Sequence, residues 1–197
     1  MEADIAQVLI SEEKIQQRNE QMAQEILAFY EGSENGLVIV AVLSGSTIFL
    51  ADLIRLLPIK LEIGFVSVSS YPGRTTESIG ATLNALSVPE LRGRDVLIVD
   101  DILDSGNTLR LVQGRIREER PHAVQTAVLL RKPDKAPSDV VAEFIGFDID
   151  DEFVVGYGLD FDGHYRNLPF IGTLRPSLFV GVDEQTANTE NATGCED

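Results

Sequence analysis

Three aspartates follow an apolar run in the middle of the chain. The run and the acids form the segment Val96-Leu97-Ile98-Val99-Asp100-Asp101-Ile102-Leu103-Asp104-Ser105-Gly106-Asn107-Thr108. Such an apolar run is typical of a buried strand, and the turn of small polar residues after it is typical of a helix start. Ligands of open α/β sheets bind at the carboxyl ends of the strands. The segment therefore predicts a ligand site at this edge of a sheet.

The residue types in this segment suit a phosphorylated sugar. The turn Ser105-Gly106-Asn107-Thr108 can direct several backbone N–H groups and hydroxyls to one point, where the helix N-terminus also favours a phosphate. The adjacent carboxylates Asp100 and Asp101 would accept hydrogen bonds from a sugar diol, with Mg²⁺ bridging the ligand nearby. In the alternative interpretation, the three aspartates only cap the helix or lie solvated in the turn.

Composition narrows the classes of function. The 197 residues include 32 acidic and 16 basic side chains, so the net charge is −16. A nucleic-acid binder needs a basic surface to displace counterions, and this charge argues against that class. The single cysteine, Cys195, excludes an intrachain disulfide and a cysteine-cluster metal site, and two histidines are too few for a histidine-rich zinc site.

Other familiar signals do not occur. No Gly-Lys-Ser/Thr triplet is present, so a Walker P-loop is excluded, and Gly156-x-Gly158 lacks the third glycine of a dinucleotide fingerprint because Phe161 stands there. The N-terminus has no basic-then-apolar run, and the longest apolar stretch, residues 37–43, is far shorter than the roughly 20 residues that span a bilayer. We therefore expect a cytoplasmic protein without a membrane partner.

Alternating strands and helices must position the site residues. Apolar runs predict strands over residues 37–43, 60–68, 95–99 and 124–130, and helical spacing predicts helices over residues 47–57 and 108–119, preceded by a helix that Ser11 caps and Gly32 ends. Strands that are apolar at every position favour a parallel sheet covered by helices. Residues 69–82 are polar and without periodicity, which predicts a functional loop.

The predicted fold class is α/β, with a twisted, mostly parallel sheet flanked by helices and a small hood formed by the N-terminal and C-terminal segments. Short strand-like pieces at residues 144–147 and 153–156 are assigned to the hood. The following boundaries are expected: a single domain over residues 1–182, with a core at about 34–142 and a hood at about 1–33 and 143–182, and an acidic, disordered tail over 183–197.

Taken together, the motifs resemble the type I phosphoribosyltransferases. Residues 96–109 are similar to the donor-binding signature of that family. Four further motifs resemble the pyrophosphate loop, the flexible loop and the base-binding hood of its hypoxanthine-guanine branch. They are Leu43-Ser44-Gly45-Ser46, Ser69-Ser70-Tyr71, Arg131-Lys132-Pro133-Asp134, and Phe153-Val154-Val155-Gly156-Tyr157-Gly158-Leu159-Asp160 with Tyr165-Arg166-Asn167-Leu168-Pro169. The resemblance covers about residues 10–175.

The resemblance implies roles around the donor. Asp100 and Asp101 would hold the ribose hydroxyls, and together with Asp160 they would bind Mg²⁺. Asp104 would act as the general base on the N7 proton of the purine. The 5′-phosphate would be bound by Ser105, Gly106, Asn107 and Thr108, and the pyrophosphate by Ser44, Gly45 and Arg166.

It also implies a base-binding set. Lys132 would donate to O6 of a 6-oxopurine. An ammonium at this position favours a base with an acceptor there and disfavours adenine, whose amino group is a donor. Phe153 would stack on the base, the Val154 backbone would bind its edge, and Asp160 would complete this side of the site. Ser70 and Tyr71 on the flexible loop would close over the reacting centre and exclude water.

Two positions depart from the family pattern. Ser44 stands where many relatives carry lysine or arginine, and Asn107 replaces a frequent basic residue of the phosphate loop. Both changes lower the local density of cations, so we expect weaker or more metal-dependent binding of the donor.

The resemblance thus implies a pentosyl transferase of purine salvage. It would use Mg²⁺ to join hypoxanthine or guanine to phosphoribosyl pyrophosphate, giving IMP or GMP and pyrophosphate, and it would form a homodimer or homotetramer. Three alternatives remain: a xanthine-preferring enzyme, an RNA-binding regulatory protein of the same fold, and a non-catalytic nucleotide sensor. The net charge of −16 and the presence of Asp104, Lys132 and Asp160 argue against the RNA-binding protein.

Overall fold

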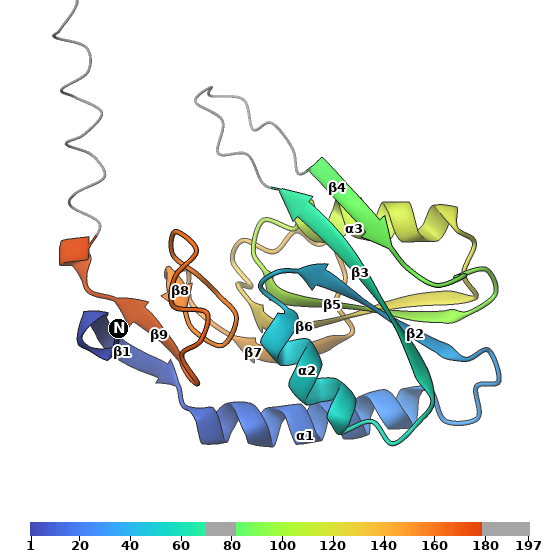
Figure 1. The fold of residues 1–197 in the computed structure, drawn as a ribbon, viewed down its shortest axis with the longest axis horizontal. Helices are drawn as coiled ribbons and strands as arrows, with labels where there is room; N and C mark the ends of the chain where they lie inside the picture. Colours follow the sequence, from blue (N-terminus) through green and yellow to red (C-terminus); the bar gives the residue numbers. More distant parts are fainter. Residues whose placement is uncertain (70–81, 179–197) are drawn as a thin grey trace, which may run out of the picture.

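The computed structural model describes residues 1–69 and 82–178 (Figure 1). Its elements in chain order are the short 3₁₀ helix η1 (Glu2–Asp4), β1 (Ile5–Ile10), α1 (Glu12–Phe29), β2 (Leu37–Leu43), α2 (Thr47–Arg55), β3 (Leu61–Ser69), β4 (Thr82–Ser87), β5 (Asp95–Leu103), α3 (Asn107–Glu118), β6 (Ala123–Arg131), β7 (Phe144–Asp148), β8 (Val154–Val155), β9 (Ile171–Leu174) and η2 (Pro176–Leu178). The predicted loop residues Ser70 and Tyr71, and the predicted tail, lie outside the described residues.

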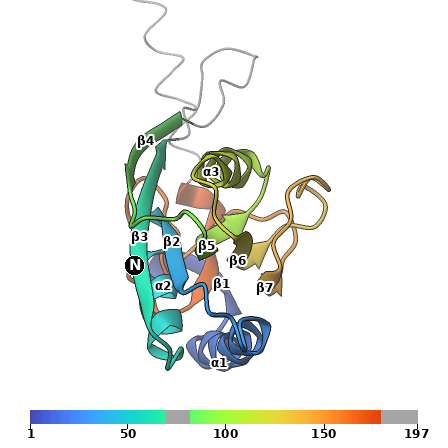
Figure 2. The same ribbon diagram turned by 90° about the vertical axis from the view of Figure 1, so that its right-hand side faces the viewer.

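Six strands form the main sheet in the order β4-β3-β2-β5-β6-β7. All neighbouring pairs from β3 to β7 are parallel, and only β4 runs antiparallel to its neighbour β3. Helices α1 and α2 lie on one face of this sheet and α3 on the other (Figure 2). The prediction of a mostly parallel α/β sheet flanked by helices is confirmed.

The continuous apolar runs arise because the central strands are buried on both faces. In β2, Ile39 and Ala41 pack under α1 and α2, whereas Val38 and Val40 pack under α3. Each of these four side chains is fully buried. A strand in this position cannot alternate apolar and polar residues, since both of its faces belong to the core.

Helix α1 begins as predicted. The Ser11 hydroxyl accepts a hydrogen bond from the Lys14 backbone N–H at 3.4 Å, and Ile15, Met22 and Ile26 are fully buried. These side chains join the core cluster between the main sheet and α2. The helix therefore covers the main sheet, although its residues fall within the range that the sequence assigned to the hood.

A second, smaller sheet contains strands from both ends of the chain, in the order β1-β9-β8. All of its pairs are antiparallel, with Ile5 opposite Leu174 and Val154 opposite Thr173. Ile5, Leu174 and Val155 form a small core of their own together with Leu168. Figure 1 shows this sheet beside the carboxyl end of β2. We call it the hood sheet. The periodicity did not predict β1.

The assignment of residues 144–147 to the hood is wrong. They belong to β7, which pairs parallel to β6 in the main sheet, with Phe144 opposite Ala127. Phe144 is buried against the core under α1, and its ring meets the Phe29 ring edge-on at 5.7 Å. A short apolar pattern predicts a strand, but it does not say which sheet the strand joins, because that depends on packing.

Strand β5 is longer than predicted. Its pairing with β6 continues to Leu103 opposite Arg131, so the acid pair lies within the strand and not after it. The ladder of backbone hydrogen bonds overrides the low strand propensity of aspartate. Among the helices of residues 1–69 and 82–178, none has the length and hydropathy needed to cross a membrane.

Candidate active site

A cavity of about 290 Å³ opens at the carboxyl ends of β2 and β5. It contains seven of the predicted site residues, which come from four separate parts of the chain. Its lining consists of Val42, Leu43, Ser44, Gly45, Val68, Asp100, Asp101, Thr108, Asp160 and Arg166. This position, at the edge where parallel strands end, is the usual ligand site of open α/β sheets.

The acid pair forms the floor of the cavity. Asp100 is only 4 % exposed, and its Oδ1 accepts a hydrogen bond from the Asp101 backbone N–H at 2.9 Å. Burial raises the pKa of Asp100 well above its usual value, and the adjacent Asp101 carboxylate raises it further. Burial also raises the pKa of Asp101, against the opposing effect of nearby hydrogen bonds and of Arg166. Two neighbouring carboxylates, of which Asp100 is buried, favour a bound cation or hydroxyl donors that compensate their charge.

These residues fit a magnesium ion that is shared with a substrate. Mg²⁺ in proteins is usually held by one or two carboxylates, several waters and substrate phosphate oxygens. Asp100 and Asp101 supply the carboxylates, and Asp160 lines the same cavity. Within the described ranges, no group of three or more His, Cys, Asp or Glu side chains is arranged to hold a metal ion. Two carboxylates with open positions beside them suit an ion that also binds a polyanion.

The loop at Ser44 and Gly45 is fixed by short-range contacts. The buried Ser46 hydroxyl donates to the Val42 carbonyl at 2.6 Å, and the Thr47 hydroxyl donates to the Ser44 carbonyl at 2.7 Å. The Leu43–Ser44 peptide bond is cis. Ser44 itself is exposed at the mouth of the cavity. The loop therefore presents backbone groups and a neutral hydroxyl to a ligand, as its departure from the family pattern implies.

The same loop is held between the acid pair and the hood. A Cβ on Gly45 would lie 1.7 Å from Asp101 Oδ2, and a Cβ on Gly158 would lie 2.0 Å from the Gly45 carbonyl oxygen. Gly158 also has a φ of +105°, which side chains rarely allow. Gly158 therefore requires glycine, whereas a side chain at Gly45 would displace the Asp101 carboxylate. Gly158 is a site residue that sequence reasoning missed, although its place in the Gly-Tyr-Gly-Leu-Asp motif is a usable signal.

Arg166 and Asp160 pair across the hood side of the cavity. Arg166 Nη2 lies 2.6 Å from Asp160 Oδ1, and Arg166 Nη1 donates to the Gly158 carbonyl at 2.6 Å. The other oxygen of Asp160 accepts from the Gly163 backbone N–H at 2.8 Å. The guanidinium is thus held over the acid pair, and it would have to exchange some of these partners to bind a phosphate group.

The turn before α3 has the geometry of an anion site. Gly106 precedes the helix with a φ of +74°, and a Cβ there would lie 2.7 Å from Pro137 Cγ. The backbone N–H groups of the first helical turn have no acceptor within the helix, so they remain available to a ligand. Thr108 lines the cavity, and the Asn107 side chain accepts a hydrogen bond from Arg110 at 3.3 Å.

Asp104 and Lys132 lie side by side just beyond the cavity. They directly follow Leu103 of β5 and Arg131 of β6, which are opposite each other in the sheet. Lys132 is only 7 % exposed, and its Nζ lies 3.2 Å from Asp104 Oδ2. Parallel register therefore brings together the predicted general base and the predicted donor to O6. Lys132 Nζ also lies 3.1 Å from Asp151, a partner that the sequence did not predict.

The predicted base-stacking residue lies at the start of the hood sheet. Phe153 is 50 % exposed, and its ring meets the Phe161 ring edge-on with centroids 5.7 Å apart. The following residue, Val154, is buried in β8. Neither residue lines the 290 Å³ cavity, which belongs to the acid pair and the loop at Gly45.

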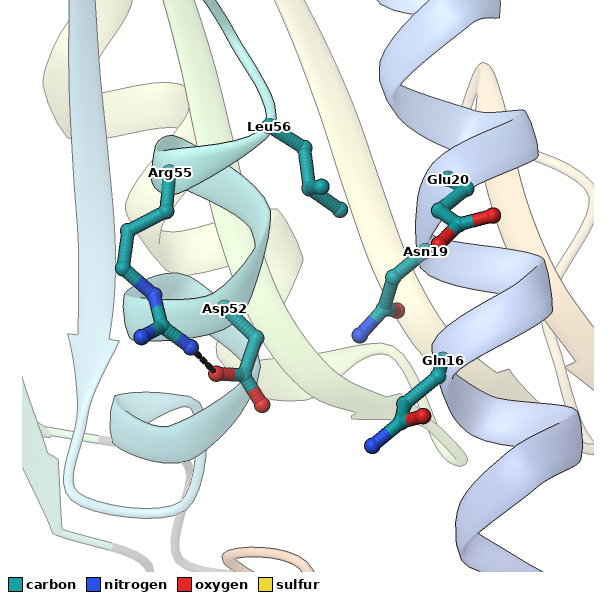
Figure 3. A pocket seen from close by; sticks show the side chains of 6 residues that line it. All are labelled: Gln16, Asn19, Glu20, Asp52, Arg55 and Leu56. Carbon is teal, nitrogen blue, oxygen red and sulfur yellow. Dashed lines mark hydrogen bonds and ion pairs between the residues drawn. The ribbon is translucent and has the colours of Figure 1, made fainter.

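A second pocket, of about 280 Å³, lies between α1 and α2 (Figure 3). It is lined by Gln16, Asn19, Glu20, Asp52, Arg55 and Leu56. Beside it, the buried Asn19 amide donates to the Tyr157 hydroxyl at 2.9 Å, and that hydroxyl donates to Asp52 at 2.6 Å. Burial, and secondarily the Asp52 carboxylate, raise the pKa of Tyr157. These bonds connect the hood motif to the helix that follows the loop at Gly45.

Comparison with known proteins agrees with this geometry. The phosphoribosyl transferase domain family matches residues 8–162. A hypoxanthine-guanine phosphoribosyltransferase from Bacillus subtilis is 39 % identical over 91 % of this chain and 98 % of that protein. A crystal structure of a hypoxanthine phosphoribosyltransferase from Staphylococcus aureus superposes with a TM-score of 0.83 at 39 % identity, covering 91 % of this chain and 96 % of that one.

A bifunctional TilS/HprT protein of Listeria innocua is 43 % identical over 91 % of this chain, but the match spans only 27 % of that longer protein. The cavity at the ends of β2 and β5 and these similarities point to one family. The chain belongs to the hypoxanthine-guanine phosphoribosyltransferases and is an enzyme of purine salvage.

Proposed function

We propose that the chain transfers the 5-phosphoribosyl group of phosphoribosyl pyrophosphate to N9 of hypoxanthine or guanine. The products would be IMP or GMP and pyrophosphate. One observation carries the proposal: the cavity that joins the acid pair, the loop at Gly45 and Arg166 lies beside the ion pair of Asp104 and the buried Lys132. The first group of residues suits a phosphorylated sugar, and the second suits a base that carries both an acceptor and a removable proton.

The binding roles follow from these positions. Asp100 and Asp101 hold the ribose hydroxyls, and the first turn of α3, with Thr108, binds the 5′-phosphate. The acid pair, with Asp160 nearby, would hold Mg²⁺, whose charge would compensate that of the diphosphate. Arg166 exchanges its contact with Asp160 for the pyrophosphate, to which it donates two parallel hydrogen bonds.

The chemical step exchanges one bond at the anomeric carbon for another. The bond between the anomeric carbon and the pyrophosphate oxygen breaks, and N9 of the base forms the new bond to that carbon. Asp104 takes the N7 proton, while Lys132 donates to O6 and favours the electron distribution in which N9 is nucleophilic. Arg166 stabilises the negative charge of the leaving pyrophosphate.

Turnover tests the proposal directly. Purified protein with Mg²⁺ and phosphoribosyl pyrophosphate is supplied separately with hypoxanthine, guanine, xanthine and adenine, and nucleotide formation is followed. We expect conversion of hypoxanthine or guanine, none of adenine, and a loss of about 10²–10⁴-fold in kcat for Asp104→Asn. A folded protein that converts no base would refute the proposal, and a preference for xanthine would change the substrate.

We also propose that the chain self-associates into a homodimer or homotetramer. Ile63 and Phe65 of β3 are 37 % and 39 % exposed, and they are apolar side chains on a strand of the main sheet. Alternate residues of a strand point to the same face, so these two side chains could contribute to one contact with another protein surface. Light scattering on the full chain measures the mass, and a monomer at micromolar concentration would contradict this expectation.

A further inference from the structure

Lys132 takes part in a closed ring of alternating charges that the proposed reaction does not by itself require. Its Nζ lies 3.2 Å from Asp104 Oδ2 and 3.1 Å from Asp151 Oδ1. Lys135 Nζ lies 2.8 Å from the same Asp151 oxygen and 3.8 Å from Asp104 Oδ1. Two lysines and two aspartates thus alternate around the ring, and their formal charges cancel.

Three backbone segments hold the ring in place, and the first is the end of β5, which Asp104 directly follows. Lys135 and Lys132 share a turn in which the Lys135 backbone N–H donates to the Lys132 carbonyl at 3.0 Å. Asp151 lies in the segment after β7, in which the Ile149 N–H donates to the Arg131 carbonyl at 2.9 Å. Asp151 also stands two residues before Phe153, so it lies between the end of β7 and the start of the hood sheet. Its position is therefore determined by the fold.

The members of the ring differ in burial. The Lys132 side chain is 8 % exposed, whereas the other three side chains are between 38 % and 46 % exposed. A buried ammonium needs compensating acceptors, because water does not solvate it. Hydrogen bonds from Lys135 and then Lys132 lower the pKa of Asp151, so this carboxylate stays ionised. Asp151 can therefore compensate the buried charge.

The proton count of Lys132 shows why a second carboxylate matters. An ammonium has three N–H donors. Asp104 and Asp151 engage two of them in the free protein, and the third remains for a ligand. During the proposed reaction Asp104 must turn to the N7 proton of the base. Asp151 is then the carboxylate that still orients and compensates Lys132.

We propose that Asp151 is a positioning residue that orients Lys132 towards O6 and thereby determines the preference for 6-oxopurines. This inference rests on the proposed function, since it assigns a partner to the base-reading lysine. Without Asp151, Lys132 keeps only Asp104 as a close carboxylate partner among the residues that the structure describes. The ion pair of Lys132 with Asp104 then competes with the contact of Lys132 to O6 and with the contact of Asp104 to the N7 proton.

The test compares Asp151→Asn with Asp150→Asn. Asp150 is the preceding residue, is exposed and lies outside the ring, so its substitution removes the same charge from the same loop. For Asp151→Asn we expect KM for hypoxanthine to rise about tenfold, as for one lost charge-assisted hydrogen bond. The expected kcat changes by less than about threefold, and KM for phosphoribosyl pyrophosphate stays constant, because the donor site is separate.

A second readout is selectivity, which a merely structural role would not change. The ratio of kcat/KM for hypoxanthine to that for adenine should fall about tenfold in Asp151→Asn and stay constant in Asp150→Asn. Asp151→Glu, which keeps the carboxylate, should recover most of the lost selectivity. Lys135→Met leaves the contact between Asp151 and Lys132 in place, so its effect should stay below about threefold.

The outcomes separate the two ideas. If the wild type converts hypoxanthine but Asp151→Asn behaves like Asp150→Asn, the positioning role is wrong and the proposed function stands. Equal losses for both substrates, with a lower melting temperature and unchanged selectivity, would also overturn the positioning role in favour of a structural one. A folded wild type that converts no base refutes the proposed function and this inference together.

Discussion

Gly158 brings the hood to within van der Waals contact of the loop at Gly45. Its φ is +105°, and a Cβ built on it would lie 2.0 Å from the Gly45 carbonyl oxygen. Carbon and oxygen approach only to about 3.3–3.6 Å even in weak C–H···O contacts. In Gly158→Ala, the hood turn and the loop must therefore move apart by on the order of 1 Å.

Two costs follow from this geometry. A non-glycine residue at positive φ costs about 1–2 kcal/mol, and forcing a methyl group against packed backbone costs about 1–3 kcal/mol. Together they predict a destabilisation of about 2–5 kcal/mol. For a domain of this size, that lowers the melting temperature by roughly 4–20 °C. Because the displaced loop forms part of the cavity, kcat/KM for phosphoribosyl pyrophosphate should fall about 100-fold.

The matched control is Gly93→Ala. Gly93 has a similar φ of +71°, but a Cβ there meets nothing within 4 Å, and the residue precedes β5 at the sheet edge opposite the cavity. This variant should show only the first cost, about 1–2 kcal/mol, with unchanged turnover. Thermal unfolding and steady-state kinetics are measured on both. If Gly158→Ala loses no more stability than Gly93→Ala and keeps its kcat/KM, the contact does not position the loop.

Three further predictions concern the same site. Arg166→Lys should lower kcat/KM for the donor by about 10–100-fold, since one charge-assisted hydrogen bond is worth about 1.5–3 kcal/mol. Steady-state kinetics with hypoxanthine in excess measure this kcat/KM, and an unchanged value would contradict the role of Arg166 in binding pyrophosphate. Asp100→Asn should raise the melting temperature at pH 7 by a few degrees while reducing turnover. Burial raises the pKa of Asp100 above 3.8, so the folded protein favours the protonated carboxyl. The stability that this carboxyl contributes is therefore lost as the pH rises from about 4 through the raised pKa. Unfolding at pH 4 and pH 7 checks the sign, as the difference from wild type should shrink at pH 4. Tyr157→Phe removes the hydroxyl that accepts from the buried Asn19 amide, so the melting temperature should fall by an amount equivalent to about 1–3 kcal/mol, and calorimetry showing no change would refute it.

Local sequence patterns predicted much of this protein. The run over residues 37–43 matches β2, and the segment from Val96 to Thr108 matches most of β5, the acid pair and the start of α3. These features are local: a strand buried on both faces must be apolar at each position, and a phosphate turn must be small and polar. Because ligands of open α/β sheets bind at the carboxyl ends of the strands, the segment also predicted a ligand site at this edge.

Tertiary structure decided the contacts that join distant segments. Tyr157 bonds to Asn19 across 138 residues and to Asp52 across 105 residues. The approach of Gly158 to Gly45, and the contact of Asp151 with Lys132, likewise depend on where the hood packs. No periodicity encodes such pairs, because strand register and layer packing select them only once the whole core forms. The sequence alone therefore predicted the strands and the turn that form the cavity, and the fold determined which distant residues pack against them.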